Sequence, residues 1–226
     1  HIVAISSMAV YDYVNLPSRS TVTEDSPIDA QMTGRDDYAQ SKMLQEMLVW
    51  QTAQSAGWRW TILRPGVIYG KGKLVSARLG IAAGKWIFRT GRSASMPLTY
   101  VENCAQAIIR AVESPAANGQ VLNIIDDAPP TQKQYGSLLA ARLSPRRRVL
   151  PIPWLFLRFA AGAAQAVNDS FFNGRAKIPG LLVPARLHAR CKPLRYANER
   201  AKRILNWTPR YTLAEALDRS IQGEQA

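Results

Sequence analysis

Histidine, cysteine and acidic residues are all scarce in this chain, and each shortage argues against a class of function. The 226 residues include two histidines and two cysteines. Two imidazoles give little support to metal catalysis or to a Ser-His-Asp triad, and Cys104 and Cys191 lie far apart without a ligand spacing. The sequence therefore predicts neither a metal site nor a disulfide framework.

Long hydrophobic runs and a secretion signal are also missing from the sequence. No uninterrupted apolar segment is long enough to span a bilayer, and no leader is recognisable, so a cytoplasmic location is expected. The first residue is His1 rather than Met, and an apolar run follows it directly. Because a buried parallel strand normally has a preceding unit to pair with, we expect that the polypeptide lacks its beginning.

The shortage of acidic residues leaves the chain strongly basic. Twenty-nine lysines and arginines against 16 acidic residues give a net charge of +13. Such a surface suits solvation alone, or attraction to anionic cofactors, membrane surfaces or nucleic acid. The basic stretches 146–148 and 192–203 lack the interleaved aromatic residues of nucleic-acid modules, so no nucleic-acid partner is predicted.

Apolar runs alternate with amphipathic segments along the chain, which is typical of a parallel, doubly wound α/β sheet. Strands are expected at residues 1–5, 58–63, 86–88, 120–125 and 149–150. Helices are expected at residues 36–56, 74–83, 101–114, 131–143, 198–205 and 213–221. The apolar segment 151–167 predicts a core or lid helix, with contact to a membrane interface as the alternative.

Tyr38 and Lys42 lie four residues apart on the first of these helices, so their side chains are expected on one face. A phenol with its ordinary pKa near ~10 is a poor base at neutral pH, and a fixed ammonium nearby favours the phenolate. The pair therefore suits proton transfer. The same spacing is more often that of a solvated surface pair, so the spacing alone does not establish chemistry.

Six short motifs occur in an order that resembles the extended short-chain dehydrogenase/reductase family, the NAD-dependent epimerase/dehydratase group. They cover nearly the whole chain: the serine-bearing strand end Ser6–Tyr11, the YxxxK of Tyr38 and Lys42, the RPxxVYG-like turn Leu63–Gly70, and the stretches Tyr100–Ala107, Gly119–Ile124 and Leu205–Pro209. The resemblance implies α/β architecture: the C-terminal part of a Rossmann-like doubly wound parallel sheet, plus a small, mostly helical substrate lobe.

The resemblance also implies a role for each matching residue. Ser7 would hydrogen-bond the reacting substrate oxygen, and Tyr38 would be the general acid/base. Lys42 would favour the Tyr38 phenolate and hold the ribose hydroxyls of a nicotinamide cofactor, NAD or NADP. The turn that follows the second large strand would pass beside the nicotinamide, with backbone groups bonding its carboxamide; it consists of Pro65, Gly66 and Val67.

The resemblance divides the chain into a cofactor domain, residues 1–70 and 99–126, and a substrate lobe, residues 71–98 and 127–226. The sequence departs from the family in one large respect, since the glycine-rich loop that cradles the pyrophosphate is absent. We therefore expect the 226-residue polypeptide to bind dinucleotide poorly and to be inactive alone.

The substrate is expected to be a small molecule, and the sequence favours an apolar one. Nucleotide-sugar epimerases carry an Arg-Asp pair where this chain has Met96 and Pro97, and a thioether cannot pair with a phosphate. The sequence TYVEN at Thr99–Asn103 and the apolar segment 151–167 resemble those of the 3β-hydroxysteroid dehydrogenase branch. A sugar-nucleotide substrate, with Arg89 or Arg92 in place of the missing arginine, is the alternative.

Two further alternatives concern what the fold does and what it contacts. A basic protein of this fold could sense NAD(P) or bind RNA without catalysis, although the presence of Ser7, Tyr38 and Lys42 argues for an enzyme. Family members often dimerise through the helix that bears the tyrosine, and Trp50 would lie in such an interface. Homodimer formation and peripheral membrane contact are therefore both left open.

Overall fold

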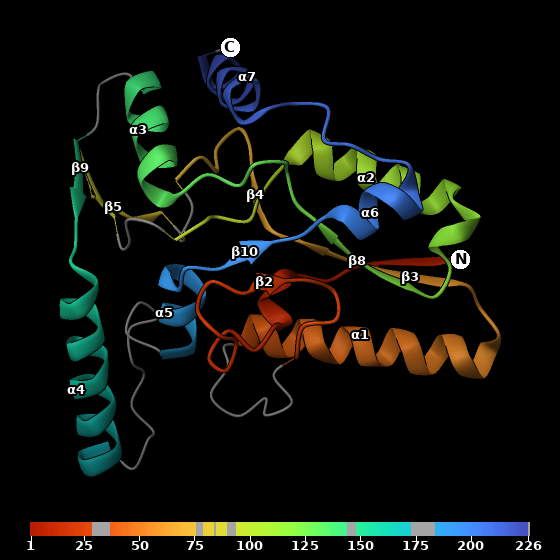
Figure 1. The fold of residues 1–226 in the computed structure, drawn as a ribbon, viewed down its shortest axis with the longest axis horizontal. Coiled ribbons are helices and arrows are strands. Elements are labelled where there is room, and N and C mark those ends of the chain that lie inside the picture. Colours follow the sequence, from red (N-terminus) through yellow and green to blue (C-terminus); the bar gives the residue numbers. More distant parts are fainter. Residues whose placement is uncertain are drawn as a thin grey trace.

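A three-stranded parallel sheet forms the centre of the protein in a computed structural model (Figure 1). The structure describes residues 1–28, 37–75, 79–83, 85–89, 94–143, 148–172 and 184–225. The sheet has the order β1–β3–β8, with β1 at Ile2–Ile5, β3 at Trp60–Pro65 and β8 at Gln120–Ile124. The strands predicted at residues 1–5, 58–63 and 120–125 are confirmed, and so is the mixed α/β fold class with parallel pairing.

Helices cover both faces of this sheet, as Figure 1 shows. Helix α1 (Asp37–Ala56) lies along one face, and helices α2 (Val101–Glu113) and α6 (Glu199–Leu205) lie along the other. Small residues of α2 let it approach the sheet closely, and the resulting core contains Leu63, Ala107, Ala111, Leu122, Ala201, Leu205 and Trp207. These helices are the ones that the apolar periodicity predicts.

Helix α1 begins at Asp37, while its predicted first residue, Asp36, lies outside the described residues. The helix buries few side chains against the sheet: Ala39, Met43, Glu46 and Ala53. Four large apolar residues lie on its outer side and are exposed: Leu44, Met47, Leu48 and Trp50. The helix therefore packs on the sheet through a few side chains and leaves an apolar outer face.

A second, smaller sheet stands beside the first in the predicted substrate lobe. Strand β5 (Gly80–Ala83) pairs antiparallel with β6 (Trp86–Arg89), and β6 pairs parallel with β9 (Arg148–Pro151). The helix predicted at residues 74–83 is therefore wrong. Ile81 pairs with Phe88 across the two strands, and such pairing overrides a weak local preference for helix.

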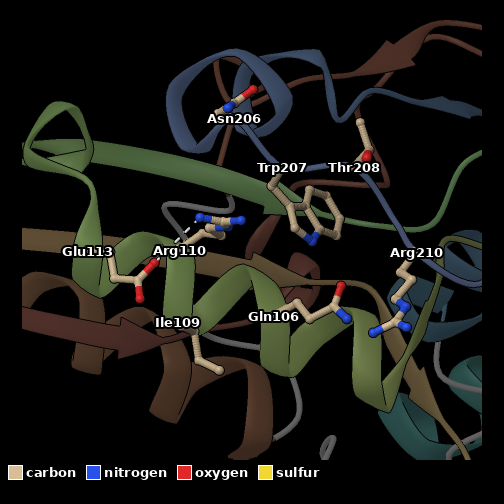
Figure 2. Close-up of a pocket in the computed structure, with 8 residues that line it drawn as sticks. All are labelled: Gln106, Ile109, Arg110, Glu113, Asn206, Trp207, Thr208 and Arg210. Carbon is tan, nitrogen blue, oxygen red and sulfur yellow. Dashed lines mark ion pairs between the residues drawn. The ribbon is translucent and has the colours of Figure 1, made fainter.

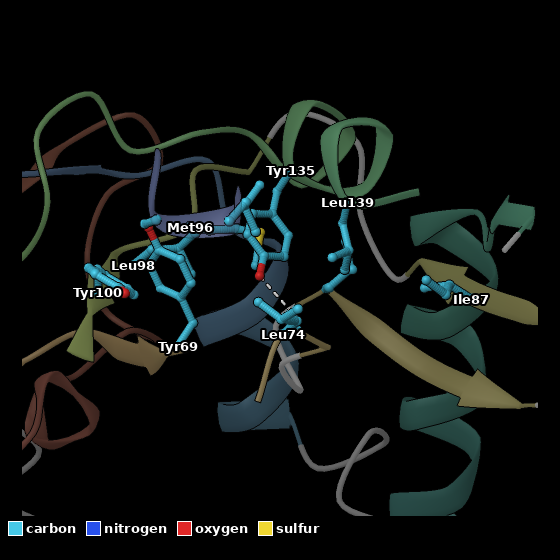
Figure 3. Packing of buried hydrophobic residues seen from close by; sticks show 11 residues of the cluster. Tyr69, Leu74, Ile87, Met96, Leu98, Tyr100, Tyr135 and Leu139 are labelled. Carbon is cyan, nitrogen blue, oxygen red and sulfur yellow. Dashed lines mark hydrogen bonds between the residues drawn. The ribbon is translucent and has the colours of Figure 1, made fainter. Parts of the chain in front are cut away.

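A tyrosine-rich core joins the two sheets (Figure 3). Strand β4 (Val67–Tyr69) pairs with β7 (Leu98–Tyr100), which places the ring of Tyr69 5.6 Å from that of Tyr100. Tyr135 of helix α3 (Gln132–Arg142) packs edge-on against Tyr69 and donates a hydrogen bond to the Leu74 carbonyl at 2.6 Å. Buried phenols with partners of this kind fix the relative positions of the strands.

The remaining elements surround these two sheets. The predicted helix at residues 131–143 is present as α3, and Thr131 caps it through a capping box with Gln134. The apolar segment forms helix α4 (Trp154–Phe172), which packs on α5 (Pro184–Cys191), and α7 (Leu213–Gln225) ends the chain. Short pieces complete the fold: β2 (Thr21–Val22), β10 (Arg195–Tyr196), and the 3-10 turns η1 (Met8–Val10) and η2 (Pro115–Ala117).

Gly66 has no room for a side chain, which gives a first prediction. A Cβ at this position would collide with the Pro97 carbonyl and press on Ile125. We expect Gly66→Ala to lower the free energy of unfolding by about 1–3 kcal/mol, because neither neighbour can move freely. Gly162→Ala is the matched control: it meets nothing within 4 Å in α4 and should raise stability by about 0.5–1 kcal/mol. Urea unfolding of both variants tests the difference.

Candidate functional site

A pocket of about 540 Å³ opens at the carboxyl ends of β1 and β3. In parallel α/β sheets this edge is where ligands bind. All six residues that the sequence singles out line the pocket: Ser7, Tyr38, Lys42, Pro65, Gly66 and Val67. Apolar side chains complete the wall, among them Ile5, Met8 and Ile68. Strand ends, one helix and one turn thus bring distant predicted residues to one cavity.

Ser7 lies just beyond β1 and caps the 3-10 turn η1. Its Oγ accepts a hydrogen bond from the Ala9 N–H at 3.1 Å. A hydroxyl that accepts one bond still has its own proton to donate. Ser7 can therefore hold the turn and offer a hydrogen-bond donor to a ligand oxygen in the pocket.

Tyr38 and Lys42 meet on the face of α1 that looks toward the pocket. The Lys42 ammonium lies 6.0 Å from the centre of the Tyr38 ring, and the Tyr38 side chain is 55% exposed. Lys42 Nζ donates to the Ile5 carbonyl at 2.7 Å and to Gln45 Oε1 at 3.0 Å. An ammonium has three donors, so one remains for a ligand. Lys42 is thus fixed to the end of β1 while Tyr38 stays accessible.

The turn Pro65–Val67 presents its backbone to the pocket in a restricted way. The Gly66 N–H donates to the Ile124 carbonyl at 3.0 Å, and the Val67 N–H donates to the Pro97 carbonyl at 2.7 Å. Proline has no N–H. The N–H groups of this turn are therefore occupied within the protein and are not available to a ligand.

A buried ion pair beneath the pocket was not predicted from the sequence. Arg64 donates to both carboxylate oxygens of Glu46, at 2.9 and 2.7 Å, and the side chains are only 3% and 11% exposed. The Ser6 hydroxyl donates to the same carboxylate. The pair therefore ties α1 to the ends of β1 and β3, one helical turn beyond Lys42.

The network extends from Arg64 to β8. Arg64 Nη1 donates to the Tyr11 hydroxyl at 3.1 Å, and Tyr11 donates to Asn123 Oδ1 at 2.7 Å. Burial raises the pKa of Tyr11, which keeps its donor proton in place. Burial by itself would lower the pKa of Arg64, but the hydrogen bonds that Arg64 donates to Glu46 and the nearby Tyr11 outweigh it and shift the pKa upward. A buried, charged network thus holds together the strand ends and the helix that carry the pocket residues.

Helix α5 adds two residues to the pocket that sequence reasoning missed, Ala189 and Arg190. They follow Tyr38 by some 150 positions in the printed sequence, and no motif marks them. Of the two arginines considered as replacements for the clamping arginine, only Arg89 belongs to the described residues. Arg89 is buried in β6 and does not line the pocket, Arg92 lies outside the described residues, and Met96 is fully buried in the tyrosine-rich core.

A second pocket of about 500 Å³ lies between α2 and the loop that follows α6 (Figure 2). Its wall contains Arg110, paired with Glu113 at 3.6 Å, and Trp207, whose buried Nε1 has no partner among the described residues. Figure 2 shows that nitrogen on the edge of the ring facing Gln106. None of the predicted site residues reaches this pocket.

Asp126 makes stability depend on pH in a defined direction. Burial raises the pKa of its carboxyl to about 6, although Asn103 and the Tyr100 N–H donate to it at 2.8 Å. The folded state then holds the proton more tightly than the unfolded chain, so stability falls as pH rises from about 4 to about 6. We expect a loss on the order of 2–3 kcal/mol across this window.

The same measurement on Asp126→Asn isolates this carboxyl from the others. The amide cannot titrate, so the difference in unfolding free energy between wild type and variant should change between pH 4 and pH 6.5. A difference that stays constant over that range would assign the pH dependence to other groups.

No cluster of three or more histidine, cysteine or acidic side chains suited to a metal ion occurs among residues that the structure describes.

Comparisons with known proteins agree with this geometry. A model of the "NAD dependent epimerase/dehydratase family" matches residues 1–124, which is more than half of the chain. That match includes every predicted site residue. A comparison with curated protein sequences returned no significant match.

Solved structures with the same fold include three whose ligands are named. RMD from Pseudomonas aeruginosa complexed with NADPH has a TM-score of 0.66 at 19% identity, over 99% of this chain and 66% of its own. UDP-glucuronic acid 4-epimerase from Bacillus cereus in complex with NAD has a TM-score of 0.65 at 16% identity, over 99% of this chain and 60% of its own.

UDP-glucose 4-epimerase from Thermotoga maritima with UDP-glucose has a TM-score of 0.65 at 18% identity, over 97% of this chain and 62% of its own. At these identities the likeness establishes the fold alone. The chain spans about three fifths to two thirds of the length of these structures.

Proposed function

Because the chain belongs to the NAD-dependent epimerase/dehydratase family, we propose that it carries the proton-transfer half of an NAD(P)-dependent oxidoreductase site. The substrate would be a small molecule with a secondary alcohol or ketone. The observation that carries this proposal is the convergence of Ser7, Tyr38 and Lys42 on one pocket at the ligand-binding edge of the sheet.

The proposed mechanism assigns one task to each of these side chains. Tyr38 exchanges a proton with the substrate oxygen, which its exposure in the pocket allows. Ser7 donates a hydrogen bond to the same oxygen and holds it near the phenol. Lys42 is held by the Ile5 carbonyl, which keeps its positive charge fixed beside the Tyr38 ring.

The pocket fits the nicotinamide end of NAD or NADP. Its volume of about 540 Å³ lies within the range of small-ligand sites, and apolar residues share the wall with the three polar ones. The cofactor supplies or accepts the hydride. Lys42 would hold its ribose hydroxyls through the remaining donor, and the Pro65–Val67 turn would offer carbonyl oxygens to the amino group of the carboxamide.

We propose that activity also requires a glycine-rich phosphate loop, because such a loop binds the pyrophosphate of the cofactor. Residues 1–226 do not contain one. The expected result for the 226-residue chain alone is weak binding of NADH in calorimetry, with a dissociation constant on the order of 1 mM. A micromolar constant for this chain would contradict the requirement. The same titration on the chain extended before His1 by a glycine-rich strand–turn–helix, called here the upstream-extended protein, provides the comparison.

An apolar, steroid-like substrate is the class that we propose first. Met8, Val67 and Ile68 line the pocket, and the position of the family's clamping arginine is taken by Met96, which is buried in the core. Arg190 of α5 favours the second candidate, a nucleotide-sugar substrate, because this residue lines the same pocket and a guanidinium suits a phosphate.

A substrate panel tests both candidates with one pair of proteins. The upstream-extended protein is assayed with hydroxysteroids and UDP-sugars in the presence of NAD or NADP, as wild type and as Arg190→Gln. Steroid turnover that the variant keeps supports the apolar class, and UDP-sugar turnover that the variant loses supports the second. Tight cofactor binding without any turnover would instead indicate a non-catalytic NAD(P)-binding protein.

A further inference from the structure

Helix α4 carries a continuous stripe of exposed apolar side chains. Phe156, Phe159, Val167 and Phe171 are all exposed. Phe159 is 75% exposed and Phe171 is 79% exposed. The positions recur at intervals of three, eight and four residues, which places them along one side of the helix. Over these residues the stripe is about 22 Å long.

A different side of α4 packs on the rest of the protein. Leu157 and Ala161 are buried against Leu187 of α5, and they form a small core of their own. Figure 1 shows α4 at the edge of the molecule, away from the central sheet, with α5 beside it. The phenylalanine stripe is therefore not needed for the packing of the helix.

The chain around α4 carries nearly all of the protein's net positive charge. Residues 128–198 contain twelve lysines and arginines and one acidic residue, Asp169, which leaves +11 of the total of +13. Basic residues stand on both sides of the helix in the sequence, with Arg146–Arg148 before it and Arg175 and Lys177 after it. An apolar stripe within so basic a segment suits a partner surface that has an anionic outer layer and an apolar interior beneath it.

We propose that α4 docks on the interface of a lipid bilayer that contains anionic headgroups. The exposed phenylalanines would enter the boundary between headgroups and acyl chains, and the net positive charge of residues 128–198 would attract the negative surface. Among the helices that the structure describes, none has the length and apolarity to cross a bilayer, so the contact is peripheral.

A second copy of the chain is a poorer partner for this stripe. Pairing two α4 helices would bring two segments of charge +11 together, and like charges at an interface oppose association. An anionic surface meets the same segment with opposite charge.

The proposal also stands apart from the proposed chemistry, because none of the stripe residues lines the pocket of Ser7, Tyr38 and Lys42.

Vesicle co-sedimentation tests the docking surface. The wild-type protein is mixed with vesicles of phosphatidylcholine alone, or with about 30% phosphatidylglycerol, at about 0.1 M and about 0.5 M salt. We expect binding to the anionic vesicles at low salt, and weaker binding both without phosphatidylglycerol and at high salt. Failure of the wild type to sediment with anionic vesicles would overturn the proposal without the need for any variant.

Matched double variants then locate the contact. Phe159→Ser with Phe171→Ser should lower the partition coefficient about tenfold or more, because two apolar anchors are lost. Ile109→Ser with Val112→Ser removes two apolar residues of α2 that are 56% and 57% exposed and should leave binding unchanged. Equal binding of both variants would refute α4 as the contact. Light scattering that shows a dimer dissolved only by the phenylalanine substitutions, without vesicle binding, would assign the stripe to a second copy.

Discussion

Replacing Tyr38 by phenylalanine should lower turnover by about 10²–10⁴-fold while leaving cofactor affinity within a few-fold of the wild type. The substitution removes one hydroxyl from a side chain that is 55% exposed in the pocket, so the fold has little to lose. Lys42 keeps its bonds to Ile5 and Gln45, because neither involves the phenol. The measurement is the steady-state rate and NADH titration of the upstream-extended protein.

Ser41→Ala is the control for Tyr38→Phe. Ser41 lies on the same helix and is exposed, and its hydroxyl bonds the Tyr38 carbonyl within the helix at 2.8 Å without lining the pocket. Its turnover should stay within about twofold of the wild type, since no proton-transfer group is lost. Equal rates in Tyr38→Phe and wild type would remove Tyr38 from the chemistry, whatever its position.

Replacing Glu46 by glutamine should produce the largest loss of stability, about 3–5 kcal/mol. The amide keeps the shape of the carboxylate but removes its charge, which leaves the Arg64 guanidinium buried without its counter-ion. It also weakens the acceptor of the Ser6 hydroxyl at the end of β1. Urea or thermal unfolding measures the change, and the midpoint should fall without a change in slope.

Glu113→Gln is the matched control for the buried pair. Glu113 pairs with Arg110 on the surface of α2 at 3.6 Å, and both side chains are more than half exposed. Because solvent screens such a pair, its loss should change stability by less than about 1 kcal/mol. Similar losses in the two variants would mean that burial does not distinguish the Glu46–Arg64 pair.

Most of the site could be predicted from the sequence because its signals are local. The spacing of Tyr38 and Lys42 and the polar end of β1 at Ser7 are both readable within a few residues. Glu46 and Arg64 could not be paired in the same way, because their contact depends on how α1 packs on β3. Arg190 enters the pocket only through the placement of α5.

The fold shows the same division between local and distant information. The three parallel strands are apolar runs that the sequence makes plain. Strand β5 was mistaken for a helix because its β structure comes from pairing with β6 rather than from its own residues. The division into a cofactor domain and a substrate lobe, and a dimer interface through Trp50, stay predictions.

Deuterium transfer tests the central claim most directly, namely that the pocket of Ser7, Tyr38 and Lys42 holds the reacting carbon beside a nicotinamide. The upstream-extended protein is incubated with NAD or NADP and the alcohols of the substrate panel, deuterated at the carbinol carbon. We predict deuterium at C4 of the reduced nicotinamide with the wild type and a loss of about 10²-fold or more in its rate with Tyr38→Phe. Normal cofactor binding with no transfer from any alcohol, or transfer that Tyr38→Phe leaves unchanged, would contradict the account.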